Sequence, residues 1–224
     1  MRTYITEPVR KIPLGTSSLR GKIISEKNNC QQEFESALER DFLQGIEFDV
    51  NVLQYCVQPV KIEYIHEGVV RHYTPDVIVY YRDDIEPAMH FKPMLCEIKY
   101  RKNLKENWKE LKPKFMAALR YADEQGWRFK IVTEKEIRTE YFANAKFLNF
   151  YKSSKFVNES DVDLLLFHLN DIKSTTPDEL LLMATNNKEK RAELLYTIWY
   201  LVSNYFINCD LSNLLDINSS IWVD

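Results

Sequence analysis

Hydrophobic residues follow a helical period near the start of this chain. Phe34, Leu38, Phe42 and Leu43 recur at positions i, i+4, i+8 and i+9 within residues 30–45. This spacing places apolar side chains on one face of a helix and leaves polar ones on the other. We therefore expect an amphipathic helix over this range.

The pattern then changes to that of strands. Four segments rich in β-branched and aromatic side chains, which favour extended structure, follow the helix. They cover residues 52–58, 60–66, 69–82 and 94–101. Glu67-Gly68 is a turn signal between the second and third segments, so these two are predicted to form a hairpin.

A second helical pattern covers residues 103–126, and residues 127–133 form a further predicted strand. Pro113 is expected at a helix start or a kink, because proline has no backbone N–H to donate. A helix, a hairpin, another strand, a helix and a final strand predict an α/β fold. Its sheet is expected to be mixed and flanked by helices.

The character of the chain changes after about residue 140. Three helical patterns are predicted at residues 160–171, 176–185 and 187–206, and the tail that follows is expected to supply a short strand pair. This arrangement is expected for a small winged-helix-like α domain. The predicted organisation is a basic N-terminal arm (1–28), an α/β domain (29–140) and the winged-helix-like domain (141–224).

Composition removes several classes of function. The 224 residues include only five glycines, and no glycine-rich phosphate loop is present, so no nucleotide cofactor is expected. No segment approaches the roughly 18 apolar residues that span a membrane, and the start of the chain has no apolar signal core. The four cysteines have no metal-ligand spacing and are expected as buried thiols. These features predict a soluble, intracellular protein.

The net charge of −3 is unusual for a protein that grips nucleic acid alone. Residues 1–28 carry a local surplus of four positive charges, with Arg2, Arg10 and Lys11 among them. This arm is expected either to be solvated or to contact DNA. We expect the isolated protein to bind DNA weakly and to acquire specificity from partners.

Two acids and a lysine stand on the predicted strands. Asp76 begins one strand, and Glu97 and Lys99 lie two positions apart on the next, so the latter two side chains face the same side. Aspartate and glutamate oxygens suit Mg²⁺ or Mn²⁺, and the Ile98 carbonyl between them is a natural additional ligand. A surface ion pair is the alternative interpretation of these three side chains.

A third acid, Glu39, lies on the first predicted helix beside its apolar stripe. It is expected to reach the sheet edge and complete the site. Glu35 shares this helical face at spacing i, i+4, so the sequence does not exclude it.

The order of these motifs resembles a known family. The segments ESALERDFL, IEFDVNVLQYCVQPVKI, YTPDVIVYY, LCEIKYR and WRFKIVTEKEI follow one another within about residues 33–137. A PD…ExK pattern after an acid-bearing helix resembles the restriction-endonuclease-like superfamily. The whole order is most similar to TnsA, the endonuclease subunit of heteromeric cut-and-paste transposases, and the compact chain is similar to TnsA proteins of CRISPR-associated transposons.

The resemblance implies a Mg²⁺- or Mn²⁺-dependent endonuclease, with one or two ions, that cuts the 5′ ends of the transposon. Glu39, Asp76, Glu97 and Lys99 take the catalytic positions, the first three also as metal ligands, and Gln58 lies near the site. Some relatives carry glutamine at the position of Glu97. The implied partners are transposon-end DNA, the DDE-type recombinase TnsB and the AAA+ regulator TnsC, in a prokaryotic cytoplasm on the nucleoid.

A basic stretch after the motif is expected to follow the DNA phosphates. Its members are Arg101, Lys102, Lys105, Lys109, Lys112 and Lys114. A solvated helix face is the alternative for these residues, and the tryptophans, including Trp108, are predicted core anchors rather than base-stacking platforms. Two other functions remain open: a free-standing restriction or repair nuclease, and a catalytically silent docking module between recombinase and regulator.

Overall fold

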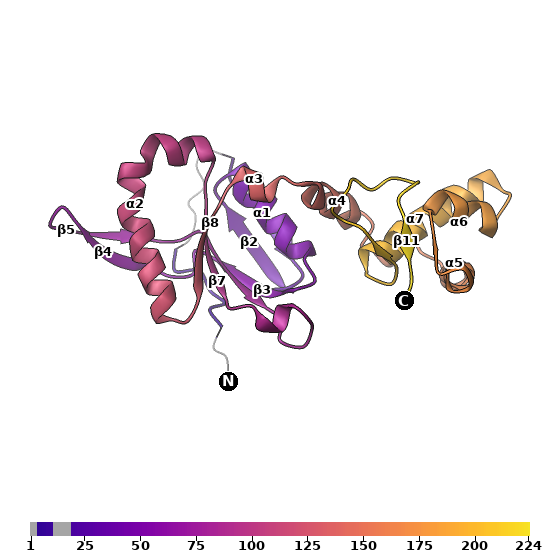
Figure 1. Ribbon diagram of the computed structural model, residues 1–224, viewed down its shortest axis with the longest axis horizontal. Helices are drawn as coiled ribbons and strands as arrows, with labels where there is room; N and C mark the ends of the chain where they lie inside the picture. Colours follow the sequence, from indigo (N-terminus) through magenta and orange to yellow (C-terminus); the bar gives the residue numbers. More distant parts are fainter. Residues whose placement is uncertain (1–3, 11–18) are drawn as a thin grey trace. The chain divides into compact units, whose positions relative to one another are not determined.

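The computed structural model describes residues 4–10 and 19–224 and divides the chain into two compact units (Figure 1). The first ends at Arg138 and the second begins at Thr139. This division falls close to the expected boundary at residue 140. Arg2 and Lys11, which belong to the predicted basic arm, lie outside the described residues.

A four-stranded mixed sheet forms the centre of the first unit. In spatial order it contains β3 (Val52–Val57), β6 (Val77–Tyr81), β7 (Met94–Ile98) and β8 (Arg128–Val132). The first three strands pair antiparallel, and β7 pairs with β8 in parallel. The predicted α/β fold with a mixed sheet is confirmed.

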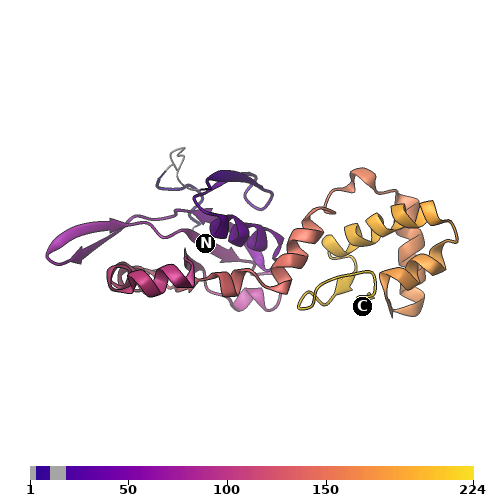
Figure 2. The same ribbon diagram turned by 90° about the horizontal axis from the view of Figure 1, so that it is seen from above.

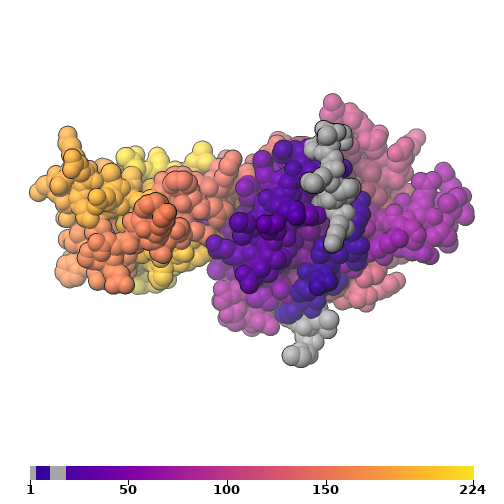
Figure 3. All heavy atoms as spheres, turned by 180° about the vertical axis from the view of Figure 1, so that it is seen from behind, coloured from indigo at the N-terminus to yellow at the C-terminus, as the bar shows by residue number. Residues whose placement is uncertain are grey.

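Helices α1 (Ala37–Phe48) and α2 (Arg101–Glu124) cover opposite faces of this sheet (Figure 2). Strand alternation explains why both faces are apolar. Along β6, Val77 joins the core beneath α1, and the next residue, Ile78, joins the core beneath α2. In Figure 3 the described residues before position 50, in indigo and violet, lie across the middle of the first unit's visible face.

The first predicted helix begins later than expected. Cys30–Phe34 is a strand, β2, paired antiparallel with β1 (Gly21–Ser25), so the expected helix over residues 30–36 and the expected irregular arm at 21–25 are both wrong. The Ser36 hydroxyl accepts a hydrogen bond from the Glu39 N–H and caps α1. Phe34 fits both the helical period and the strand period. In the structure it is buried together with Gln32, two residues before it, as expected for one face of a strand.

The predicted hairpin is present as β4 (Ile62–His66) and β5 (Val69–Tyr73), joined by Glu67 and Gly68, which both have positive φ. The single strand expected over residues 69–82 is instead two strands, β5 and β6. The break contains Pro75, which cannot donate a ladder hydrogen bond.

Helix α2 contains a bend, but not at the expected residue. Asn107 has non-helical dihedral angles, φ −114° and ψ 18°, whereas Pro113 lies within the second, longer part of the helix. The Asn107 side-chain amide donates to the Asn103 carbonyl over 3.2 Å. This local hydrogen bond competes with the helical ladder at the bend.

Two shorter helical segments complete this unit: η1 (Ala88–His90) and α3 (Glu134–Ile137). Across the described residues, no helix combines the length and apolarity needed to cross a membrane. Cys56 and Cys96 are buried as expected, whereas Cys30, at the start of β2, is exposed and Cys209 is only partly buried.

The second unit is mainly helical. Its elements are α4 (Glu140–Asn149), η2 (Ser154–Phe156), α5 (Glu159–Ile172), β9 (Ser174–Thr175), α6 (Pro177–Ala184), α7 (Lys188–Ser203), β10 (Asn208–Cys209) and β11 (Ile221–Trp222). The expected strand pair β10–β11 is confirmed, and β11 also pairs with β9. Helices α5 to α7 followed by this hairpin have the element order expected of a winged-helix-like module.

Candidate active site

Asp76 is held at the point where three strands meet. Its backbone N–H donates to the Cys96 carbonyl over 3.0 Å, and its own carbonyl accepts from the Gln58 N–H over 2.7 Å. The carboxylate Oδ2 accepts from the Ile98 N–H over 2.6 Å. Backbone contacts to β3 and β7 therefore fix the direction of the Asp76 side chain.

Glu97 and Lys99 lie together at the end of β7, as the strand alternation predicts. Lys99 Nζ is 3.2 Å from Glu97 Oε1 and 4.0 Å from Asp76 Oδ2. The Lys99 N–H also donates to the Val132 carbonyl, so β8 supports the residue from the other side. The structure brings the predicted aspartate, glutamate and lysine into one cluster.

The Glu97 carboxylate is more deeply buried than its motif position suggests, with 1% of its side chain exposed. Lys114 Nζ lies 3.1 Å from Oε1, and the Tyr73 hydroxyl donates to Oε2. The Lys114 ammonium also lies 4.6 Å from the centre of the Tyr73 ring. Glu97 is thus surrounded by two cations and a hydroxyl, which satisfies a buried charge.

Sequence reasoning missed Tyr73 and assigned Lys114 to an outward-facing basic stretch. Tyr73 stands three residues before Asp76, and only the fold of β5 turns it toward Glu97. Lys114 follows Pro113, but its helical neighbours Lys109 and Lys112 are exposed. Its contact with Glu97 depends on how α2 packs on the sheet.

The Glu39 carboxylate accepts hydrogen bonds at the N-terminus of its own helix, α1. Its Oε2 accepts from the Glu35 N–H over 2.8 Å and its Oε1 accepts from the Ser36 hydroxyl over 2.9 Å. Together with the Ser36 side chain, which accepts from the Glu39 N–H, these bonds cap the N-terminus of α1. The carboxylate is also close enough to interact electrostatically with Lys99 and Asp76.

Glu35, the open alternative to Glu39, has other partners. Arg10 Nη2 lies 2.6 Å from its Oε2, and Gln58 Nε2 lies 3.4 Å from the same oxygen. Arg10 Nε also donates to Gln58 Oε1 over 3.0 Å. Gln58 is buried and contacts the Asp76 backbone, so the structure places it beside the cluster as expected.

The acids repel one another in a poorly solvated site. Burial raises the pKa of Asp76 well above its usual value, and the nearby Glu97 charge raises it further. Burial also raises the pKa of Glu39, although hydrogen bonds from Glu35 and Ser36 oppose the shift. Burial lowers the pKa of Lys99, but the attraction of Asp76 and Glu97 outweighs it and leaves that pKa raised.

The cluster does not contain a ready-made cage for a metal. Within residues 4–10 and 19–224, no three His, Cys, Asp or Glu side chains gather closely enough to hold an ion. Mg²⁺ does not require such a cage, since it commonly takes one or two carboxylates and keeps several waters. Among the described residues, no hydrogen bond to Asp76 Oδ1 is found, so this oxygen can serve as a ligand.

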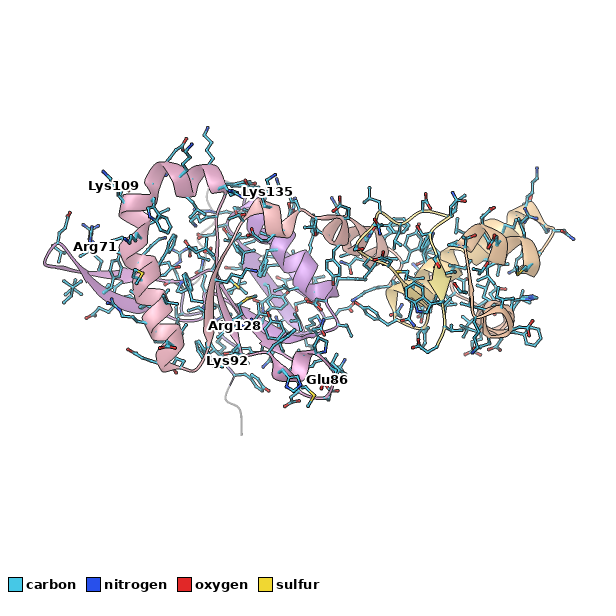
Figure 4. The ribbon with its side chains drawn as sticks, in the orientation of Figure 1. Arg71, Glu86, Lys92, Lys109, Arg128 and Lys135 are labelled. Atoms are coloured by element: carbon cyan, nitrogen blue, oxygen red, sulfur yellow. The ribbon has the colours of Figure 1, made fainter. Side chains whose placement is uncertain are left out.

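The basic residues predicted to contact DNA begin two positions after Lys99. Arg101, Lys102, Lys105 and Lys109 are all exposed in the first half of α2. Lys102 makes a long ion pair of 3.9 Å with Glu106. Figure 4 shows Lys109 and Lys135 at one end of the unit and Arg128 and Lys92 toward the other.

Two protein-family models match this chain. A model described as the TnsA-like endonuclease N terminal matches residues 49–134, and one described as the TnsA endonuclease C terminal matches residues 136–211. The chain belongs to the TnsA endonuclease family. The two matches meet where the structure divides into two units. No curated protein matches the chain.

Membership in the TnsA family makes the chain a nuclease subunit of a transposase. Its mixed sheet flanked by helices is the restriction-endonuclease-like fold that the resemblance implied. Asp76, Glu97 and Lys99 lie within the matched N-terminal region, whereas Glu39 precedes it.

Proposed function

We propose that this TnsA-family chain cleaves the 5′ ends of transposon DNA by metal-dependent phosphodiester hydrolysis. The observation that carries the proposal is the position of Lys99 Nζ, between Glu97 Oε1 and Asp76 Oδ2. The Lys99 ammonium can contact a phosphate that enters the cluster, while the two carboxylates keep the ammonium oriented. Asp76, Glu97 and Lys99 then act together with Glu39.

Asp76 Oδ1, the Ile98 carbonyl and the Glu39 carboxylate are the proposed ligands of one or two Mg²⁺ or Mn²⁺ ions, with Glu97 at the edge of the same site. Bound there, the metal supplies positive charge that neutralises the scissile phosphate and activates water. The raised pKa values of Asp76 and Glu39 support this assignment, because repelling carboxylates in a buried site gain from a cation.

Lys99 is proposed as a hydrogen-bond donor rather than a proton acceptor. Its pKa is raised by Asp76 and Glu97 against the opposing effect of burial, so the ammonium form persists at neutral pH. A charged donor stabilises the negative charge that develops on a phosphate oxygen during cleavage. Glu97 holds this ammonium in place, and Lys114 and Tyr73 hold Glu97.

The proposed partners are the transposon-end DNA, the recombinase TnsB and the regulator TnsC. The net charge of −3 supports dependence on partners, since phosphate neutralisation by Lys and Arg supplies much of DNA affinity. Arg101, Lys102, Lys105 and Lys109 are proposed DNA contacts. The unit from Thr139 onward is proposed to be a winged-helix-like module that docks on the protein partners.

One observation favours a second candidate, a docking module without cleavage. Glu97 is occupied by Lys99, Lys114 and Tyr73, and no three-ligand group stands within the described parts of the chain. Calorimetry with Mn²⁺ separates the two candidates. The nuclease should release or absorb heat that Asp76→Ala removes, whereas a silent module should show no Asp76-dependent heat.

The direct test is cleavage of labelled transposon-end DNA in Mg²⁺, with and without the recombinase. We expect 5′-strand nicks from the native protein and none from folded Asp76→Ala. Glu63→Ala, which removes an exposed acid from β4, is the matched control and should cut normally. Cleavage by folded Asp76→Ala would refute the assignment, and cutting without the recombinase would favour a free-standing nuclease.

A further inference from the structure

An open groove lies beside the first half of α2. Its volume is about 850 Å³, its apolar floor includes Leu104, Trp108 and Ile131, and its rim carries three cations. These cations are Arg101, Lys102 and Lys105. The bend at Asn107 separates the rim residues from the longer part of α2 that packs on the sheet. The groove is lined by this first part of α2 together with Ile131, Thr133 and Glu136.

Trp108 is not the core anchor that the sequence predicts. The residue is 45% exposed, whereas Phe115, whose ring centre lies 6.1 Å away, is buried. Phe115 already closes the core beneath this part of α2. Packing against Phe115 thus covers only part of the Trp108 side chain, and the rest of the indole faces the groove.

The groove lies on the same face of the sheet as Glu97. In the parallel pair β7–β8, Ile131 on the groove floor is the register partner of Glu97. Aromatic contacts also link the groove to Glu97. Phe115 packs against both Trp108 and Tyr73, and the Tyr73 hydroxyl donates to Glu97. The groove and the Glu97–Lys99 cluster therefore share one face of the sheet.

We propose that this groove binds one unpaired nucleotide of the DNA strand next to the scissile phosphate. Trp108 stacks on the base, and Arg101, Lys102 and Lys105 contact the flanking phosphates. This inference rests on the proposed nuclease function and adds a base-binding subsite to it. Aromatic stacking tolerates any base sequence, so the subsite need not contribute sequence recognition.

Charge favours a nucleic acid over a protein segment as the occupant. Three cations line the groove against one acid, Glu136, whose carboxylate accepts a hydrogen bond from the Thr133 N–H. Phosphate contacts alone need no aromatic floor, and the bases of a duplex are stacked against one another. An apolar floor with a cationic rim therefore fits a base that has left the stack, together with its phosphates.

The test compares Trp108→Ala and Trp108→Phe in the full chain. The probe is a fluorescently labelled transposon-end duplex with one unpaired thymidine beside the cleavage position, and its Kd is measured by anisotropy without metal, alone and with the recombinase. Trp108→Ala should weaken binding by about 5- to 150-fold, the range expected for one stacked base. Trp108→Phe should restore most of the affinity, and Leu119→Ala, an equally exposed apolar residue on α2, should change nothing.

A second probe replaces the unpaired thymidine with an abasic sugar. The native protein should then bind as weakly as Trp108→Ala. Four outcomes overturn the inference: no binding of the thymidine probe, equal affinity of native protein and Trp108→Ala, the same loss on a fully paired duplex, or a loss of recombinase binding alone.

Cleavage of the paired substrate by the native protein is measured in parallel. If the native protein cuts and Trp108 has no effect on binding, only the base-binding subsite is refuted. If it never cuts, the proposed function fails, whatever the affinities are.

Discussion

Lys114 donates a hydrogen bond to Oε1 of Glu97 over 3.1 Å, although the two residues belong to α2 and β7. Lys99 reaches the same oxygen at 3.2 Å. A carboxylate with 1% of its side chain exposed is thus balanced by two ammonium groups. This contact ties the helix that carries the basic stretch to the strand that carries the nuclease motif.

Removal of Lys114 should destabilise the protein through Glu97. Lys114→Met is expected to lower the free energy of unfolding by about 1–3 kcal/mol, because a buried carboxylate loses one of its charged donors. Urea denaturation measures this change. Lys112→Met, an exposed neighbour on α2, should stay within about 0.5 kcal/mol of the native protein.

The double variant Lys114→Met with Glu97→Gln tests whether the loss acts through Glu97. It should recover part of the stability, since the uncompensated charge is gone. Strictly additive effects of the two substitutions would show that the contact does not couple them.

Asp76→Asn should stabilise the metal-free protein at neutral pH. Burial and the Glu97 charge raise the folded-state pKa of Asp76, so the ionised form disfavours folding. This penalty is absent below the unfolded-state pKa of about 3.9, grows as pH rises toward the folded-state pKa, and is complete above it. The asparagine oxygen can still accept from the Ile98 N–H.

Thermal unfolding in a chelator across this pH range measures the effect. The variant should have the higher Tm at neutral pH, and the difference should disappear at acid pH. Added Mg²⁺ should raise the Tm of the native protein but not that of Asp76→Asn. A native protein that is more stable than the variant at neutral pH in the chelator would contradict the prediction.

Glu39 has a structural role at the start of α1 and a proposed role in metal binding, and two substitutions can separate them. Glu39→Gln should keep the fold, since the glutamine side-chain oxygen can still accept from the Glu35 N–H. Cleavage should still fall by at least about tenfold if the negative charge is needed for metal binding. Glu39→Ala should also lose about 0.5–2 kcal/mol of stability, because the cap loses its reciprocal bonds.

Cleavage rates and urea denaturation of both variants are measured side by side. If Glu39→Gln cuts at the native rate, Glu39 is a capping residue only. Full stability of Glu39→Ala would show that the capping bonds contribute nothing measurable.

Local pattern was sufficient for the strand that carries Glu97, but it missed the break before Asp76 and failed where two patterns coincide. Alternation placed Glu97 and Lys99 on one face, and backbone pairing of β6 with β7 brought Asp76 to them. Phe34 satisfied a helical and an extended spacing at once. Pairing of β2 with β1, a contact between separate segments, selected the strand.

The sequence by itself determined the α/β fold class and the family. These depend on short-range periodicity and on the order of segments, which are properties of the chain alone. Tertiary structure decided that Lys114 and Tyr73 hold Glu97, and that the bend at Asn107 leaves Trp108 facing a groove. Those contacts join elements distant in the chain, so their geometry exists only once the helices have packed on the sheet.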